Sequence, residues 1–143
     1  MMDRLDSTAR SALMRAVRRK DTTPELRVRR LAHRLGLRFR LHRHDLPGTP
    51  DLVFPRWHIA LFVHGCFWHR HSGCRYATMP ATRREFWEAK FTANQARDCR
   101  QAERLGSLGW RVVVVWECET RTSPALEARL RALFALPSAT RES

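Results

Sequence analysis

The stretch PDLVFPRWHIALFV, residues 50–63, decides the fold. Two segments rich in branched and aromatic side chains, PDLVF and IALFV, flank the turn sequence PRWH, and this pattern predicts a β-hairpin. If the turn is centred on Trp57, Asp51 lies directly across from Val63 on the neighbouring strand. The hairpin is therefore expected to place a carboxylate beside a backbone carbonyl, a pair of hard oxygen donors that suits Mg²⁺. The alternative is an ordinary turn carboxylate, because Pro-Asp is a common turn dipeptide.

The segments around the hairpin predict an α/β fold. Apolar residues recur at helical spacing in four segments, which cover residues 7–19, 22–36, 83–105 and 123–136. Strands are expected over residues 38–42 and 110–116 in addition to the hairpin. The apolar run in the later strand is typical of a central strand that is buried on both faces. The element order therefore predicts a mixed central sheet flanked by helices on both faces.

The charge of the chain indicates the class of its partner. The 143 residues include 27 Lys and Arg against 14 Asp and Glu, a formal net charge of +13. A small domain tolerates such self-repulsion most readily when it binds a polyanion. We therefore expect a nucleic-acid partner.

Length and hydropathy limit the organisation of the chain. The length fits a single domain over residues 1–143, with a basic N-terminal helix or arm over residues 1–20 and a flexible tail over residues 137–143. No apolar run approaches the roughly 20 residues that span a membrane. The N-terminus also lacks the apolar segment of a secretory signal. A cytoplasmic protein with no membrane partner is expected.

A group of thiols and one imidazole predicts a structural metal site. Cys66, His71 and Cys74 lie close together in a Gly-containing loop, and Cys118 follows the strand expected at 110–116. Three thiolates and an imidazole form a closed tetrahedral Zn²⁺ site, which would fasten the loop to the sheet. A disulfide is disfavoured in the cytoplasm, so the alternative is a set of unligated core thiols.

Aromatic residues on this loop and on the helix that follows it suggest contacts with nucleic-acid bases. Phe67 and Trp68 lie on the loop, and an exposed ring can wedge between base steps where pairing is already weakened. The alternative for such rings is core packing. One face of the helix expected at 83–105 offers a ring, two cations and an amide, from Trp87, Lys90, Asn94 and Arg97.

Taken together, several motifs resemble the very-short-patch mismatch-repair endonucleases of bacteria. They are PGTPDLVF at residues 47–54, FVHGCFWH at 62–69, Phe86-Trp87 with Lys90, Asn94, Arg97 and Asp98, and GWRV through WEC at 109–118. The resemblance covers about residues 8–120. It implies a fold similar to that of type II restriction enzymes. It also implies an Mg²⁺-dependent endonuclease that nicks duplex DNA 5′ to the thymine of a T·G mismatch, leaving a 3′-hydroxyl and a 5′-phosphate.

The resemblance also implies a role for each matching residue. Asp51 would bind Mg²⁺ by its side chain and Val63 by its carbonyl oxygen, while Glu25, His64 and His69 would surround the hydrated ion. His69 is the candidate acid or base, because an imidazole ordinarily titrates near neutral pH. Two alternatives remain. Glu25 completes a Thr22-x-x-Glu25 capping box, and His64 could be a satisfied strand-end histidine.

For DNA recognition, the resemblance implies that the rings of Phe67, Trp68 and Trp87 insert between base steps. Lys90 and Asn94 would read the wobble pair, with Met14 as an apolar neighbour. Because the mismatch arises by deamination of 5-methylcytosine, a functional link to a cytosine-5 methyltransferase is implied. A monomer associated with the nucleoid is expected. Two other functions remain open, a non-catalytic zinc-stabilised DNA-binding protein and a restriction or homing nuclease of the same fold.

Overall fold

The structure is a computed structural model and describes residues 21–136. The expected helix at 7–19 and Met14 lie outside these residues. The helices are α2 (Thr23–Arg34), α3 (Arg84–Ser107) and α4 (Ser123–Leu133), and the strands are β1 (Arg40–Leu41), β2 (Leu52–Phe54), β3 (Ile59–His64) and β4 (Arg111–Trp116). Short 3₁₀ turns follow β2 and β4, at Pro55–Trp57 and Glu117–Thr120. None of the described helices is long and apolar enough to cross a membrane.

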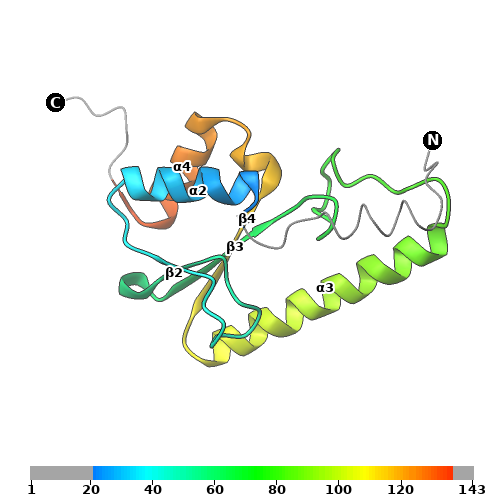
Figure 1. The fold of residues 1–143 in the computed structure, drawn as a ribbon, viewed down its shortest axis with the longest axis horizontal. Coiled ribbons are helices and arrows are strands. Elements are labelled where there is room, and N and C mark those ends of the chain that lie inside the picture. The colour runs from blue at the N-terminus through cyan, green and yellow to red at the C-terminus, as the bar shows by residue number, and fades with distance from the viewer. Residues whose placement is uncertain (1–20, 137–143) are drawn as a thin grey trace.

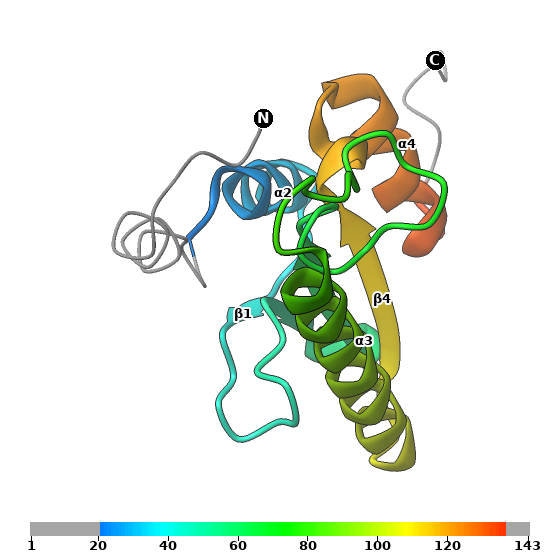
Figure 2. The ribbon, with the colours of Figure 1, turned by 90° about the vertical axis from the view of Figure 1, so that its right-hand side faces the viewer.

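The strands form one mixed sheet in the order β1-β2-β3-β4. The first two pairings are antiparallel, and β3 pairs with β4 in parallel. Helices α2 and α4 cover one face of the sheet and α3 crosses the other (Figures 1 and 2). The larger core lies under α2 and α4, and Ala60, Phe62 and Leu105 form a smaller cluster on the α3 side. These features confirm the expected mixed α/β fold with helices on both faces.

The hairpin register corrects the expected pairing of Asp51 with Val63. Leu52 pairs with Leu61 and Phe54 with Ile59, so the same register continued by one residue sets Asp51 across from Phe62. The reason is the turn, in which a 3₁₀ segment is followed by His58 in the left-handed region at φ 55°. This four-residue connection moves the centre of the hairpin by half a residue.

The expectation that residues 110–116 form a central buried strand is wrong. β4 lies at the end of the described sheet, and only Val113 and Val115 are buried. The buried strand is β3, whose neighbours β2 and β4 shield it on both sides. A continuous apolar run does not distinguish a central strand from an edge strand whose outer side chains line a cavity. Val112 and Val114 do line one, between the sheet and α3.

Helix α2 begins where its sequence signals predict. Thr22 is the N-cap and its Oγ1 accepts a hydrogen bond from the Glu25 amide at 3.3 Å. Pro24 occupies the first turn, where its missing N–H costs nothing. The helix ends before Gly36, which adopts φ 81°. This start fixes Glu25 in the first turn of the helix, where its side chain is buried.

Candidate active site

The predicted metal ligands of the loop come together in space. One ligand atom from each of Cys66, His71, Cys74 and Cys118 lies within 4.8 Å of the others. The His71 Nδ1 is 3.7 Å from the Cys66 Sγ and 3.4 Å from the Cys118 Sγ. These residues belong to the irregular segment 65–83 and to the turn after β4. The cluster therefore could hold a metal ion that ties the loop to the sheet.

The surroundings shift the pKa values of the three thiols in different directions. Burial raises the pKa of the Cys66 thiol to about 12, and burial likewise raises the pKa of Cys118. By contrast, a backbone hydrogen bond from Tyr76 heads the interactions that lower the pKa of Cys74. A bound metal ion favours the thiolate form of all three, so the donor set fits a tetrahedral ion of the zinc type.

Asp51 lies at the start of β2, beside the end of β3. Its Oδ2 accepts a hydrogen bond from the Val63 amide at 2.8 Å, so the two residues are in contact even though they are not paired in register. Burial raises the pKa of Asp51 to about 7, and the Glu25 charge acts in the same direction, against the Val63 amide and the Arg29 charge. A carboxylate disfavoured by burial gains a great deal from an adjacent cation. The oxygen donors here therefore fit a hard divalent ion.

Glu25 is buried at 1% exposure and joins a small polar network next to Asp51. Its Oε1 accepts from the Asp21 amide at 3.0 Å, and its Oε2 contacts the His42 Nε2 at 2.6 Å and the Arg29 guanidinium. The capping-box interpretation is thus half right. Thr22 caps the helix, but the Glu25 carboxylate reaches Asp21 and the site rather than the Thr22 amide.

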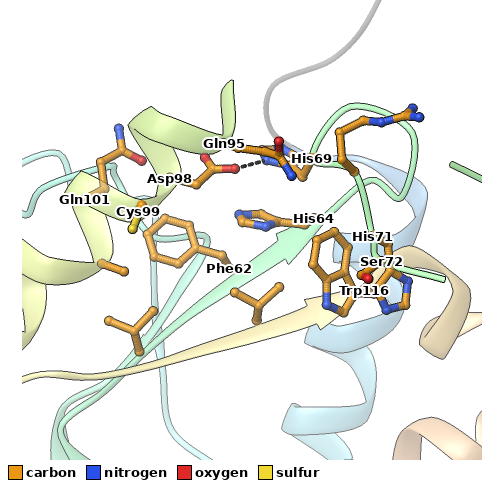
Figure 3. A pocket seen from close by; sticks show the side chains of 14 residues that line it. Phe62, His64, His69, His71, Ser72, Gln95, Asp98, Cys99, Gln101 and Trp116 are labelled. Atoms are coloured by element: carbon orange, nitrogen blue, oxygen red, sulfur yellow. Dashed lines mark hydrogen bonds and ion pairs between the residues drawn. The ribbon is translucent and has the colours of Figure 1, made fainter. Parts of the chain in front are cut away.

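Two histidines and an aspartate form a second group, at the other side of β3. The rings of His64 and His69 are stacked, with centroids 3.8 Å apart and an interplanar angle of 6° (Figure 3). The His69 Nδ1 lies 2.7 Å from the Asp98 Oδ2 on α3. This contact fixes the orientation of the His69 ring. It also places the ring hydrogen on Nδ1, facing the Asp98 carboxylate, so that Nε2 remains for proton transfer.

The surroundings tune the members of this group differently. Burial, aided by the nearby His69, lowers the pKa of His64 to about 4, so His64 is neutral at neutral pH. Burial alone would raise the pKa of Asp98, but the hydrogen bond and charge of His69 outweigh it and the net shift is downward. Asp98 is therefore the charged member of the group, and it can stabilise a proton on His69.

These residues open onto a cavity of about 520 Å³ between α3 and the sheet (Figure 3). Phe62, Val112 and Val114 supply its apolar wall, and Asp98 and the two histidines supply polar groups. Trp116 connects the cavity to the cluster of three cysteines and His71, because its ring stacks on His71 at 4.3 Å and meets His64 edge-on at 5.4 Å.

The predicted aromatic residues also come together. Phe67 and Trp68 are partly exposed on the loop and pack edge-on against each other at 5.1 Å. Trp87, however, is only 7% exposed, which corrects the expectation of a free stacking ring on the helix. It packs on Phe67 at 5.7 Å and on Phe91, and so supports the two loop aromatics.

The polar side chains on α3 differ in their contacts and in their exposure to solvent. The Asn94 Nδ2 donates to the Trp68 carbonyl at 3.2 Å, which leaves its Oδ1 for other partners. Lys90 is half-buried, and the Arg97 side chain is 46% exposed. Arg70 holds the loop from within, donating to the carbonyls of Phe67 and Thr78.

Two partners of the site receive no role from the sequence: Asp98, which is named only as part of a motif, and His42. Asp98 lies four residues after Asn94, so continuing the helical spacing would have placed it on the same face. His42 gave no signal, because only the tertiary fold brings β1 against the start of α2.

Known proteins resemble this chain over most of its length. A family model described as "DNA mismatch endonuclease Vsr" matches residues 2–75. The chain is 56% identical over 131 residues to "Type II nicking enzyme V.XorIIP" of Xanthomonas oryzae pv. oryzae, covering 92% of this chain and 96% of the relative. It is 45% identical over 135 residues to "DNA mismatch endonuclease Vsr" of Escherichia coli, covering 91% and 86%. A third relative, "Type II nicking enzyme V.NmeAIP" of Neisseria meningitidis, is 35% identical over 133 residues, covering 93% and 94%.

Proposed function

Since this chain belongs to the Vsr family of DNA mismatch endonucleases, we propose that it nicks duplex DNA on the 5′ side of the thymine in a T·G mismatch. Membership confirms the resemblance noted from the motifs and makes the chain a hydrolase that acts on DNA, which removes the non-catalytic alternative. The observation that carries the proposal is that Asp51 accepts a hydrogen bond from the Val63 amide, one residue along β3 from His64, and that His64 stacks on His69, which Asp98 orients.

The histidine pair is suited to move the proton of the attacking water. Asp98 accepts a hydrogen bond from the Nδ1–H of His69, so the Nε2 lone pair is available to take a proton. The charge of Asp98 then stabilises the imidazolium that forms. His64, stacked on His69 and kept neutral by burial, holds the ring in place without adding a competing positive charge. His69 then releases this proton to solvent, and solvent supplies the proton that the departing 3′ oxygen takes up.

We assign the oxygen site to Mg²⁺, held by the side chain of Asp51 and the carbonyl oxygen of Val63. When bound, the ion would supply Lewis-acid stabilisation of the charge that develops on the phosphate. Glu25 contributes negative charge beside Asp51, and Arg29 and His42 hold Glu25 in place. The expected products are a 3′-hydroxyl and a 5′-phosphate.

We assign Zn²⁺ to the Cys66, His71, Cys74 and Cys118 cluster. The support is the softness of three sulfur donors and their closed arrangement with one imidazole. The zinc would be structural, because four protein ligands leave no position for a substrate.

The DNA-binding surface is proposed to include Phe67, Trp68, Lys90, Asn94 and Arg97, with Trp87 behind the loop aromatics and Met14 in the N-terminal segment. The excess of positive charge suits binding to the phosphate backbone. Phe67 and Trp68 supply the rings that can enter a weakened base step. A monomer would suffice, because one active site cuts one strand.

The proposed substrate implies that the protein acts in a cell that methylates cytosine. A T·G mismatch is what deamination of 5-methylcytosine leaves in duplex DNA, so we propose a functional link to a cytosine-5 methyltransferase. The enzyme would then act in the cytoplasm, at the nucleoid.

One assay tests the activity itself. Purified protein is incubated with end-labelled duplexes that carry T·G or C·G at one position, with and without Mg²⁺. We expect a single nick 5′ to the thymine, only in the T·G duplex and only with Mg²⁺. Cleavage of both strands would instead favour a restriction or homing nuclease.

Replacing Asp98 by Asn should lower the nicking rate constant by about 10² to 10³ without a matching loss of DNA affinity. An amide can donate to Nδ1 and stabilise the wrong tautomer of His69, and general base catalysis contributes about 10² to 10⁴. Single-turnover rates and a binding titration on the same variant separate the two effects. Asp45→Asn is the matched control, because Asp45 pairs with Arg43 on an exposed loop. If Asp98→Asn nicks at a rate within threefold of wild type, the proposed role of His69 in proton transfer is wrong.

Replacing Trp68 by Ala should reduce the ratio of T·G to C·G cleavage about tenfold or more. Wedging costs a few kcal/mol of unstacking, and a wobble pair already surrenders part of it. Trp57→Ala is the control, because Trp57 packs on Phe54 and Phe134 at the hairpin, away from the loop. It should lower the melting temperature and leave the ratio unchanged. The wedge is wrong if Trp68→Ala behaves in the same way as Trp57→Ala.

A further inference from the structure

We propose that His64, His69 and Asp98 form a second Zn²⁺ site, at which the ion inhibits the enzyme. One ligand atom from each residue lies within 4.8 Å of those of the other two. The residues come from the end of β3, the loop and the middle of α3, and they meet at the cavity wall (Figure 3). None of them belongs to the Cys66, His71, Cys74 and Cys118 cluster.

The donor atoms suit zinc better than magnesium. Two imidazole nitrogens and a carboxylate oxygen are ligands that zinc binds readily, whereas Mg²⁺ prefers oxygen donors throughout. Three protein ligands would leave a fourth position for water. The two neighbouring sites would therefore bind different ions. The oxygens around Asp51 would bind Mg²⁺, and the histidines would bind excess Zn²⁺.

Only small movements are needed to close this site around an ion. Bonds of about 2.0 to 2.2 Å set two tetrahedral ligand atoms roughly 3.3 Å apart, and the His69 Nδ1 and Asp98 Oδ2 are already 2.7 Å apart. The stacked rings must tilt out of parallel to aim their lone pairs at one ion. That tilt is a rotation about χ2 of a histidine, which is a broad torsion. The side chains of His69 and Asp98 are 22% and 20% exposed, so the ion can reach them from solvent.

Binding of zinc at this site removes the base that nicking requires. A neutral imidazole has one nitrogen with a free lone pair. If zinc takes the Nδ1 of His69, the proton moves to Nε2, and if zinc takes Nε2, that nitrogen is occupied. In both cases His69 no longer accepts a proton from water. The inhibition thus rests on the proposed function, whereas the binding does not.

The test begins with the zinc-loaded protein and titrates further Zn²⁺ by calorimetry. Wild type should bind one equivalent beyond the structural ion, and Asp98→Asn and His64→Asn should each weaken that equivalent at least tenfold. Asp51→Asn is the matched control and should bind it as wild type does, because Asp51 belongs to the oxygen site. Melting curves show which variants are folded. Nicking by wild type at fixed Mg²⁺ should fall in proportion to occupancy of the added equivalent.

Each possible result of the titration supports or overturns the proposed zinc site. The site is absent if wild type binds no further equivalent, or if folded Asp98→Asn and His64→Asn both bind it as tightly as wild type. Loss of the equivalent in Asp51→Asn alone would move it to the oxygen site and overturn the proposal. Full occupancy with unchanged nicking would overturn the inhibition. If wild type binds the ion as expected but nicks no T·G duplex, the proposed function fails and the metal site stands.

Discussion

Replacing Asp51 by Asn should lower the nicking rate about a thousandfold or more, which corresponds to about 4 kcal/mol of transition-state stabilisation. The amide keeps the shape of the side chain but is a much weaker ligand for a divalent cation. Because burial already disfavours the charged form of Asp51, the neutral amide should cost little stability. Binding to a T·G duplex should remain within a few-fold of wild type, since we expect the affinity to come from the basic surface and the loop aromatics. Single-turnover nicking with Mg²⁺ and a binding titration measure both quantities.

The control for this variant is again Asp45→Asn, which removes a carboxylate outside the site and should nick normally. If Asp51→Asn nicks within tenfold of wild type, the cation is bound elsewhere and the oxygen site is wrong. If the variant loses rate and affinity together while remaining folded, Asp51 acts in DNA binding rather than in the chemical step.

Replacing Cys118 by Ser should remove zinc from the native protein and lower the free energy of unfolding by several kcal/mol. Cys118 joins the turn after β4 to the loop that carries His69, Phe67 and Trp68. Without the ion, the buried Cys66 thiol keeps its proton, and the loop loses the metal-mediated link to the turn after β4. The melting temperature should fall by about 10 °C or more, and nicking should fall with it.

Cys99→Ser is the matched control, because Cys99 is an exposed thiol on α3 outside the cluster. It should retain one zinc per chain and the wild-type melting temperature. Elemental analysis of native protein, followed by thermal melts with and without a chelator, measures both effects. A wild-type protein with no zinc, or a Cys118→Ser variant with wild-type stability, would overturn the assignment.

The sequence by itself determined the parts of this protein that depend on local pattern. Alternating and continuous apolar runs located the hairpin, and Thr22 with Pro24 located the start of α2. Ligand spacing brought Cys66, His71 and Cys74 to one loop, and Cys118 could be added because it follows the strand expected at 110–116. These predictions succeeded because the interactions involved span few residues or repeat along one element.

Only the tertiary structure decided the register of the hairpin, the edge position of β4 and the partners of the candidate catalytic side chains. A half-residue shift in the turn depends on His58 adopting a positive φ, which the residue type does not impose. Burial of Trp87 and of Glu25 depends on what packs over them from other elements. The contact between His69 and Asp98 joins a loop to a helix 29 residues later. Such long-range contacts are fixed by how the layers pack, and for that reason the local pattern cannot specify them.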